Sequence, residues 1–571
     1  MNSAPRFRLS WVPTLILAVF LIPVSLGLAG TWLPAFGWFP ALDQTHFSLQ
    51  PWRELLDYPG FIRATQLTLI TGLGSAVLAV VATLILLMAF YPSSLFRRLE
   101  RWLAPVLSVP HAAFAIGLGF LITPSGWLMR LFASLTGVPV YPPNWLTFQD
   151  PWGISLILVL TLKETPFLVF MALASLPSLK VSQTLWLGRS LGYGRTKIWL
   201  TLLWPQLYPR LRLPFFAVAA YNLSVVDLAL IAGPTTPPTL AVLVNRLFND
   251  PDLLLRLPGA AGATALLLLT VAVLFSLRLS EPLVRYWQQR AVLNGRRWRQ
   301  ALGLHPLASS VLGLGVVAYG GALVVLVLWS LAGPWRFPDA LPQFDWSHWQ
   351  NAPRQFGSAL WLTFSTGLCA ALIALILVIA ALENEVRLNY QRRDFNAQRL
   401  LWLLYLPLLV PQIAFLFGFQ VSLIWLNLDR HWWVLVWSHL VFVLPYTFLT
   451  LSGPYRAFDD RYSWLAQSLS GSRWQAWWRI KLGMLWRPIG YSLATGFAVS
   501  VAQYLPTLFI GGGRFATLTT EAVSLASGSD RRAAAVSALA QQGLPLLGFA
   551  LAALVVSWRY RRHRDLQQGG S

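Results

Sequence analysis

The chain has 571 residues, with 43 lysines and arginines against 21 aspartates and glutamates, and a formal charge of +22. Hydrophobic residues make up 56% of it, charged residues only 11%, and the mean hydropathy is +0.57. These values exclude a soluble globular protein and predict an all-α polytopic membrane protein. The single cysteine, Cys369, excludes intrachain disulfides and thiolate metal clusters, and the seven histidines show no metal-ligand spacing.

Twelve apolar segments are long enough to cross a bilayer, which takes about 20 helical residues. They lie at about residues 11–33, 64–91, 103–123, 152–176, 211–233, 259–279, 307–331, 358–382, 400–424, 432–452, 488–511 and 533–557. The first segment is too long for a removable signal peptide and lacks a small-residue cleavage site. We therefore expect about twelve transmembrane helices.

The excess positive charge lies before the first expected span, after every second span and at the end of the chain. These segments include Arg97-Arg98-Arg101, Arg296-Arg297-Arg299, Arg392-Arg393 and Arg559-Arg561-Arg562-Arg564. By the positive-inside rule they face the cytoplasm, so both termini are expected there. The charge is thus explained by topology and by attraction to anionic lipid headgroups, and no nucleic-acid partner is expected.

Short motifs recur in the two halves of the chain. In the second and eighth spans, Leu67-Thr68 and Thr71-Gly72-Leu73 match Leu362-Thr363 and Thr366-Gly367-Leu368. In the third and ninth, Val109-Pro110-x-x-Ala113-Phe114-x-x-Gly117 matches Val410-Pro411-x-x-Ala414-Phe415-x-x-Gly418. Each half has an even number of spans, so the repeats should be parallel. We expect a first half at 1–290, with a repeat core at about 60–280, and a second at 291–571, with a core at about 355–560.

The clearest repeat is a polar, basic segment after the fourth span of each half. Trp186-Leu187-Gly188-Arg189-Ser190-Leu191-Gly192-Tyr193-Gly194-Arg195-Thr196-Lys197-Ile198-Trp199 recurs as Trp464-Leu465-Ala466-Gln467-Ser468-Leu469-Ser470-Gly471-Ser472-Arg473-Trp474-Gln475-Ala476-Trp477. A duplicated cytoplasmic loop predicts two equivalent docking sites for a partner. The alternative is a basic amphipathic segment that lies on the lipid headgroups.

The spacing of this loop resembles the cytoplasmic signature of binding-protein-dependent ABC import permeases: E-A-A, three residues, Gly, nine residues, I-x-L-P. In the first half the corresponding positions hold Trp186-Leu187-Gly188, Gly192 and Leu202-x-Trp204-Pro205. In the second half they hold Trp464-Leu465-Ala466, Ser470 and Ile480-x-Leu482-Gly483. Both halves replace the acidic first residue with Trp, and the second half also lacks the Gly and the Pro of the signature.

The resemblance implies two short helices in each loop, the first of which docks in a cleft of a separate ATPase subunit. The docking positions are then Trp186, Gly188, Gly192, Arg195, Pro205, Trp464, Ala466, Ser470, Arg473 and Gly483. Gly192 can adopt the positive φ of a turn between the helices. The tryptophans are typical interface hot spots, and Arg195 and Arg473 can pair with carboxylates of a partner.

The resemblance also implies an assembly in the bacterial inner membrane. It would contain two copies of the ATPase, and a periplasmic solute-binding protein would deliver the solute. Among fused twelve-span permeases the chain is most similar to the thiamine and ferric-iron importer group, in a thiamine-type branch.

The chain has no ATP-binding motif of its own. A P-loop places its lysine directly after a glycine, and none of the four lysines, Lys163, Lys180, Lys197 and Lys481, follows one. No catalytic triad, zinc-protease motif or carboxylate pair stands out either. We expect no enzyme activity, no metal and no cofactor bound by this chain; ATP and Mg²⁺ would belong to the partner ATPase.

Charged residues within expected spans are candidates for the translocation path, because charges in a membrane are costly and usually functional. Glu164 follows Lys163 in the fourth span, and Asp227 lies in the fifth. Ser224-x-x-Asp227 parallels Ser500-x-x-Gln503 in the eleventh span. An acidic path would suit a cationic solute such as thiamine. Alternatively, Lys163 neutralises Glu164 or Asp227 in a structural pair, and the polar residues hold helices together.

Together these features predict the transmembrane permease subunit of an ABC importer. A proton-driven secondary transporter with twelve spans is the alternative, in which Glu164 and Asp227 would relay protons. It accounts for the spans but not for the duplicated loop. A membrane scaffold without transport activity is a further alternative.

Overall fold

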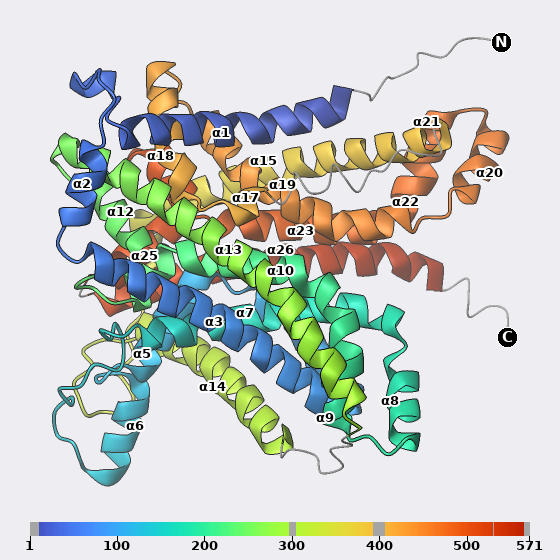
Figure 1. Cartoon of the computed structure of the whole chain (residues 1–571), viewed down its shortest axis with the longest axis horizontal. Coiled ribbons are helices and arrows are strands. Elements are labelled where there is room, and N and C mark those ends of the chain that lie inside the picture. Colours follow the sequence, from blue (N-terminus) through green and yellow to red (C-terminus); the bar gives the residue numbers. More distant parts are fainter. Residues whose placement is uncertain (1–10, 296–303, 392–405, 529, 565–571) are drawn as a thin grey trace.

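The computed structural model of the chain describes residues 11–295, 304–391, 406–528 and 530–564 (Figure 1). The chain is an all-α polytopic membrane protein, and the described residues contain only two isolated β-bridges besides helices and turns. The basic groups Arg296-Arg297-Arg299 and Arg392-Arg393, and the side chains from Arg559 onward, lie outside the described part of the structure.

The helices before residue 296 are α1 (Val12–Ala35), α2 (Gln50–Asp57), α3 (Phe61–Phe90), α4 (Ser94–Ser108), α5 (His111–Ile122), α6 (Trp127–Thr136), α7 (Ile154–Ser175), α8 (Val181–Ser190), α9 (Arg195–Ile198), α10 (Trp204–Ser224), α11 (Asp227–Ala232), α12 (Leu240–Phe248) and α13 (Arg256–Leu293). Those after it are α14 (Leu304–Ser330), α15 (Ser347–Gln391), α17 (Leu406–Leu409), α18 (Ile413–Trp425), α19 (Trp432–Arg456), α20 (Arg461–Ser470), α21 (Arg473–Gln475), α22 (Leu482–Met484), α23 (Trp486–Val501), α24 (Leu505–Gly511), α25 (Leu518–Ala526) and α26 (Arg531–Arg564).

Nine spans among the described residues are long and apolar enough to cross a membrane, and the pair α23 and α24, bent by 60°, would be a tenth. Two expected spans do not meet this criterion. The span at 211–233 is divided between α10 and α11, and the span at 400–424 contains α18, which has only 13 residues. The sequence prediction of twelve continuous spans therefore missed breaks in the third, fifth, ninth and eleventh.

The repeated Val-Pro pair breaks the helix within the predicted third and ninth spans; residues 400–405 of the ninth lie outside the described part of the structure. Val109 is extended, with φ −66° and ψ 122°, between α4 and α5. The equivalent pair, Val410-Pro411, separates α17 from α18. Proline disfavours the helical conformation of the residue before it and cannot donate a backbone hydrogen bond. The expected span at 103–123 is consequently two helices, of which α5 has 12 residues.

The first long helix of each half packs against the short helix of the other half: α1 lies on α18 and α14 lies on α5. A Cβ atom on Gly30 of α1 would lie 2.6 Å from the carbonyl oxygen of Gly418, and one on Gly117 of α5 would lie 2.8 Å from that of Ala322. Gly418 N also donates to Thr31 Oγ1 at 3.2 Å. The repeated glycines are thus points where two helix backbones meet, as small residues permit.

The repeated Leu-Thr motif also has one structural role in both halves. Leu240 N, the first amide of α12, donates to Thr68 Oγ1 at 2.8 Å. Leu518 N, the first amide of α25, donates to Thr363 Oγ1 at 2.9 Å. Each threonine thereby satisfies an amide that a helix start leaves without an intrahelical acceptor. The long helices α3 and α15 hold the short helices α12 and α25 in this way.

Helix α6 and the segment after α14 are joined by the buried Arg130. Its Nε donates to Ser125 O at 3.0 Å, its Nη1 donates to Arg336 O at 2.8 Å, and its guanidinium lies 4.7 Å from the Trp335 ring. These contacts link segments that are far apart in the sequence.

Replacing this guanidinium is expected to destabilise the protein. Arg130→Met leaves the part-buried carbonyls of Ser125 and Arg336 without this donor, which costs about 1–3 kcal/mol. A lower unfolding temperature in detergent, relative to the parent protein, would show the loss. Arg354→Met, at an exposed arginine of α15, is the matched control and should leave that temperature unchanged. Equal temperatures for both variants would contradict the role of Arg130.

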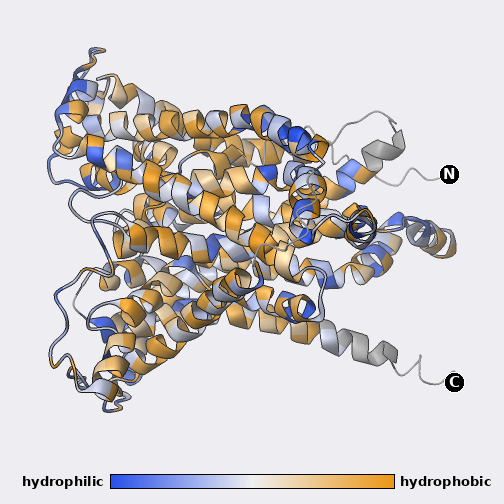
Figure 2. Ribbon diagram, turned by 60° about the horizontal axis from the view of Figure 1, so that its bottom comes forward, coloured by the Kyte–Doolittle hydropathy of each residue, from blue (hydrophilic) through white to orange (hydrophobic). Residues whose placement is uncertain are grey.

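Most of the long helices run in roughly the same direction, and the docking segments lie at one end of it (Figure 1). Figure 1 shows the start of α1, the end of α26, α8 and α20 on the same side of the molecule. Hydrophobic residues predominate along the middle of the long helices, whereas hydrophilic residues gather toward the two ends (Figure 2). The duplicated loops therefore lie outside the apolar layer.

Candidate functional site

The first docking loop folds as two short helices, α8 and α9, joined at a glycine. Gly192 has φ +82°, as the sequence predicted for the turn. Gly192 N donates to Arg189 O at 2.9 Å and Tyr193 N donates to Gly188 O at 3.0 Å, which together form a Schellman motif. A Cβ on Gly188 would lie 2.6 Å from Ile198 Cδ1, so this position lets α8 pack closely on α9.

The second docking loop makes the same turn one residue later. Helix α20 continues to Ser470, and Gly471, with φ +65°, ends it. Gly471 N donates to Gln467 O at 2.9 Å. The sequence comparison placed Ser470 at the turn and inferred that the second half lacks its glycine. That inference is wrong, because Gly471 supplies the positive φ.

A π-helical turn follows both loops, over Trp199–Leu203 in the first half and Ala476–Lys481 in the second. Pro205 lies at the start of α10, directly after the π-helical turn and within one continuous helical stretch. Gly483 lies in α22, and nothing stands within 4 Å of where its Cβ would be. The segments that follow the two docking loops, at Pro205 and at Gly483, therefore differ in structure as well as in sequence.

The two loop arginines are not equivalent. The guanidinium of Arg195 donates to Met88 O and Tyr91 O, so it caps the end of α3. Burial, with a smaller contribution from Arg189, lowers the pKa of Arg195 from its ordinary value. Arg473 is exposed at the start of α21. Arg195 thus bonds within the chain itself, and of the two arginines only Arg473 is exposed for the predicted pairing with a partner's carboxylates.

Both docking helices expose apolar side chains outside the helical bundle. The Trp186 side chain is 70% exposed and that of Trp464 is 54% exposed. Leu187 and Leu191 beside the first, and Leu465 and Leu469 beside the second, are exposed as well. Ala466, at the position of Gly188, is half-buried on α20. The loops thus present two similar apolar surfaces at one end of the molecule (Figure 1).

The carboxylates of Glu164 and Asp227 are buried among the spans. His111 Nε2 lies 3.7 Å from Glu164 Oε1, and the His111 ring meets the Tyr221 ring edge-on at 5.5 Å. The His111 side chain is 35% exposed although the rest of α5 is largely buried. Asp227 is the first residue of α11, where the helix dipole favours a negative charge.

Lys163 does not form the structural pair considered above. Its Nζ donates to Val109 O at 2.7 Å and lies 5.7 Å from the centre of the Tyr319 ring. Among the described residues, no ion pair within 4 Å joins Lys163 to Glu164 or Asp227. The lysine stabilises the break between α4 and α5, which leaves the two carboxylates without its ammonium group as a direct counter-ion.

Tyrosines of both halves lie within electrostatic range of these carboxylates. Tyr221 interacts electrostatically with Asp227, Glu164 and Tyr446, and Tyr504 interacts with Asp227. Tyr446 belongs to α19 and Tyr504 precedes α24. The members of this carboxylate cluster are His111, Glu164, Tyr221, Asp227, Tyr446 and Tyr504. It lies where the two halves meet.

The serines predicted for the path have partners within the protein. Ser224 Oγ donates to Ala220 O of its own helix at 2.8 Å. The Ser500 hydroxyl lies 2.8 Å from His439 Nδ1, and His439 Nε2 lies 3.0 Å from Thr507 Oγ1. These contacts favour the helix-packing alternative for both serines.

Gln503 lies half-buried in the break between α23 and α24. The proposed parallel between Asp227 and Gln503 is out of register, because Asp227 begins α11 whereas Leu505 begins α24. The second half therefore carries an apolar residue at the position of Asp227, and the carboxylates of the cluster come from the first half alone.

Sequence reasoning missed a buried ionic group beside the second docking loop. Lys481 Nζ lies 3.1 Å from Glu383 Oε2 and 3.1 Å from Asp460 Oδ1, and its side chain is 3% exposed. Tyr455 OH donates to Glu383 Oε2 at 2.8 Å. The available signal was that Lys481 is the single lysine of the second half.

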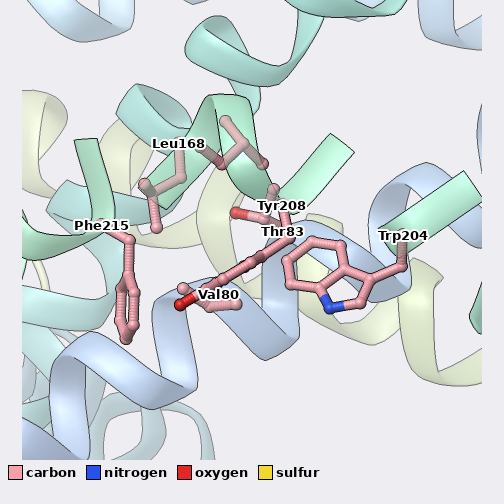
Figure 3. Close-up of a pocket in the computed structure, with 7 residues that line it drawn as sticks. Val80, Thr83, Leu168, Trp204, Tyr208 and Phe215 are labelled. Carbon is pink, nitrogen blue, oxygen red and sulfur yellow. The ribbon is translucent and has the colours of Figure 1, made fainter. Parts of the chain in front are cut away.

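A small pocket lies between α3, α7 and α10 (Figure 3). Its lining residues are Val80, Thr83, Leu168, Trp204, Tyr208, Leu211 and Phe215. The Tyr208 hydroxyl donates to Glu281 Oε1 at 3.3 Å. The lining has no charged side chain, so this pocket offers nothing to hold an ion. Across the described residues, no group of three His, Cys, Asp or Glu could hold a metal.

Known proteins provide an independent comparison. The chain is 34% identical over 551 residues to the inner membrane ABC transporter permease protein YnjC of Escherichia coli strain K12, and the alignment covers 96% of each chain. No protein-family model matches the chain, and no solved structure does.

Proposed function

The chain belongs to the inner membrane ABC transporter permeases, and from this we propose that it is the pore-forming subunit of an importer for a small solute. The observation that carries this proposal is the pair of apolar docking surfaces on α8 and α20, at one end of the molecule. Exposed tryptophans and leucines on short helices outside the bilayer are suited to a protein partner.

In this proposal each docking surface holds one copy of a separate ATPase. The ATPase supplies ATP hydrolysis and its Mg²⁺, and this chain catalyses no reaction. The end that carries α8 and α20 faces the cytoplasm together with both termini, in agreement with the distribution of arginines and lysines. A periplasmic binding protein delivers the solute to the opposite end.

The two halves, residues 1–290 and 291–571, form the two sides of the path. The first long helix of each half packs on the other half, α1 on α18 and α14 on α5. This packing supports a single unit in which the two halves move together. ATP-driven closure of the ATPases would bring the docking loops together and so alternate access to the path.

The carboxylate cluster is the proposed point of solute contact. Glu164 and Asp227 bring two buried carboxylates together with the Tyr221, Tyr446 and Tyr504 rings. Carboxylates and aromatic faces both attract organic cations. A small cationic solute fits this chemistry, and thiamine is the candidate that the family resemblance indicates.

The decisive experiment removes both docking surfaces. Trp186→Asp combined with Trp464→Asp places charge in each interface and is expected to lower ATPase co-purification at least tenfold. Membrane insertion and detergent stability should stay at the parent level, because both side chains lie outside the bundle.

Trp145→Asp is the matched control, since Trp145 is 55% exposed on the loop between α6 and α7 at the other end of the molecule. It should retain full ATPase binding. Full binding by the double variant would refute the docking function of the loops.

A further inference from the structure

The second docking loop is fixed to the membrane spans by the buried ionic group at Lys481. Its two carboxylates come from different elements, since Glu383 lies on α15 and Asp460 directly precedes α20. Lys481 itself ends the π-helical turn that leads into α22. One ammonium group therefore joins a long span, the start of the docking helix and the end of the loop.

Tyr455 connects a second span to the same group. Its hydroxyl donates to Glu383 Oε2 at 2.8 Å, and its ring centre lies 4.7 Å from Lys481 Nζ. Trp477 Nε1 donates to Tyr455 OH at 3.4 Å. Because Tyr455 belongs to α19, the loop is tied to α15 and α19 together.

The first docking loop is attached by different chemistry. Arg195 donates to Met88 O and Tyr91 O, and Lys197 donates to Ala291 O at the end of α13. The position that corresponds to Lys481, counted from the matching tryptophans 186 and 464, is Leu203, which is fully buried. Cations cap helix ends in the first half, whereas a lysine pairs with carboxylates in the second.

The attachment at Lys481 resists separation. Its side chain is 3% exposed, and withdrawing this buried ammonium group from the Glu383 and Asp460 carboxylates, which are 11% and 19% exposed, would be unfavourable. Buried groups that share charge and hydrogen bonds behave as one unit. A displacement of α20 would therefore carry α15 and α19 with it.

We propose that Lys481 is a positioning residue through which the second docking loop drives α15 and α19. This inference rests on the proposed function, because the displacement comes from an ATPase docked on α20. It adds an asymmetry: charge pairing transmits the movement in the second half, and carbonyl caps transmit it in the first.

The test measures movement and docking separately in the full chain bound to its ATPase. In a Cys369→Ser background, labels on Arg53→Cys of α2 and Arg354→Cys of α15 report the separation of the two halves at the end opposite the docking loops. The parent complex is expected to change this distance when ATP and vanadate are added.

Lys481→Met should lower the ATP-dependent distance change by more than half while ATPase co-purification stays within twofold of the parent. Lys481→Arg keeps the charge and should restore most of the change. Glu383→Gln, which leaves the lysine in place, should reproduce the Lys481→Met result. Lys180→Met, at an exposed lysine beside the first loop, is the matched control and should behave as the parent.

The possible outcomes distinguish a failure of this inference from a failure of the proposed function. A parent-like distance change in Lys481→Met overturns this inference and leaves the proposed function intact. Loss of ATPase binding in both Lys481→Met and Glu383→Gln also overturns it, because the group would then serve docking rather than transmission. A parent chain that binds no ATPase refutes the proposed function itself.

Discussion

Gly418→Ala is expected to abolish the folded protein, although it adds a single methyl group. The new Cβ would lie 2.5 Å from Thr31 N and still closer to the Gly27 carbonyl oxygen. Both are backbone atoms of α1, so no side chain can move aside, and the helices α1 and α18 would have to separate. That separation also breaks the hydrogen bond from Gly418 N to Thr31 Oγ1. Overpacking at a close helix crossing costs several kcal/mol.

The measurement is the yield of monodisperse protein after detergent extraction, followed by its unfolding temperature. Gly453→Ala is the matched control, because this glycine of α19 has nothing within 4 Å of its Cβ position. It should give parent-like yield. A Gly418→Ala protein with the same yield and unfolding temperature would show that α1 does not cross α18 as closely as described.

The close crossing of α1 and α18 was only partly predictable from the sequence repeats. The match between Gly117 and Gly418 marked both positions as special from the sequence alone. Their partners, Ala322 and Gly30, come from the opposite half, several hundred residues away in the case of Gly418. Helix exchange between halves depends on which apolar surfaces meet, and apolar composition alone does not specify that.

The breaks within the spans were missed for a related reason. Val109-Pro110 lies within a continuous apolar stretch, and hydropathy does not distinguish an extended valine from a helical one. The Val-Pro pair was nevertheless a local signal, because proline restricts the residue before it. The break before Asp227 carries no comparable residue, so the sequence does not indicate where α11 begins.

Charged side chains were the least predictable part of the site. Arg195 and Arg473 occupy the same place in the repeat, yet only Arg195 reaches the end of a long helix. Lys163 follows the expectation that an intramembrane charge has a partner, but its partner is the Val109 carbonyl and not a carboxylate. The partner of a long, flexible side chain depends on the tertiary structure around it. The spacing of residues along one helix does not determine that partner.

The carboxylate cluster leads to the second large effect: Glu164→Gln combined with Asp227→Asn is expected to abolish transport while leaving assembly intact. Both carboxylates are buried, and Lys163 donates to the Val109 carbonyl between α4 and α5. A cation that enters the cluster would gain contacts with two charges in surroundings that screen them poorly. Losing about 1.4 kcal/mol per contact already lowers occupancy tenfold, so the double variant should lose uptake at least tenfold.

The measurement is ATP-driven uptake of labelled thiamine, the candidate cation, into vesicles that contain the permease, its ATPase and its binding protein. Ser224→Ala is the control, because the Ser224 hydroxyl bonds to its own helix, and its uptake should stay within twofold of the parent. Parent-like uptake by the double variant would remove the cluster from the path. Uptake that persists without the ATPase but stops when the proton gradient collapses would instead assign Glu164 and Asp227 to proton relay. The energy source of uptake therefore separates an ATP-driven permease from an ion-coupled one, because neutralising both carboxylates would remove a proton relay as well as a cation site.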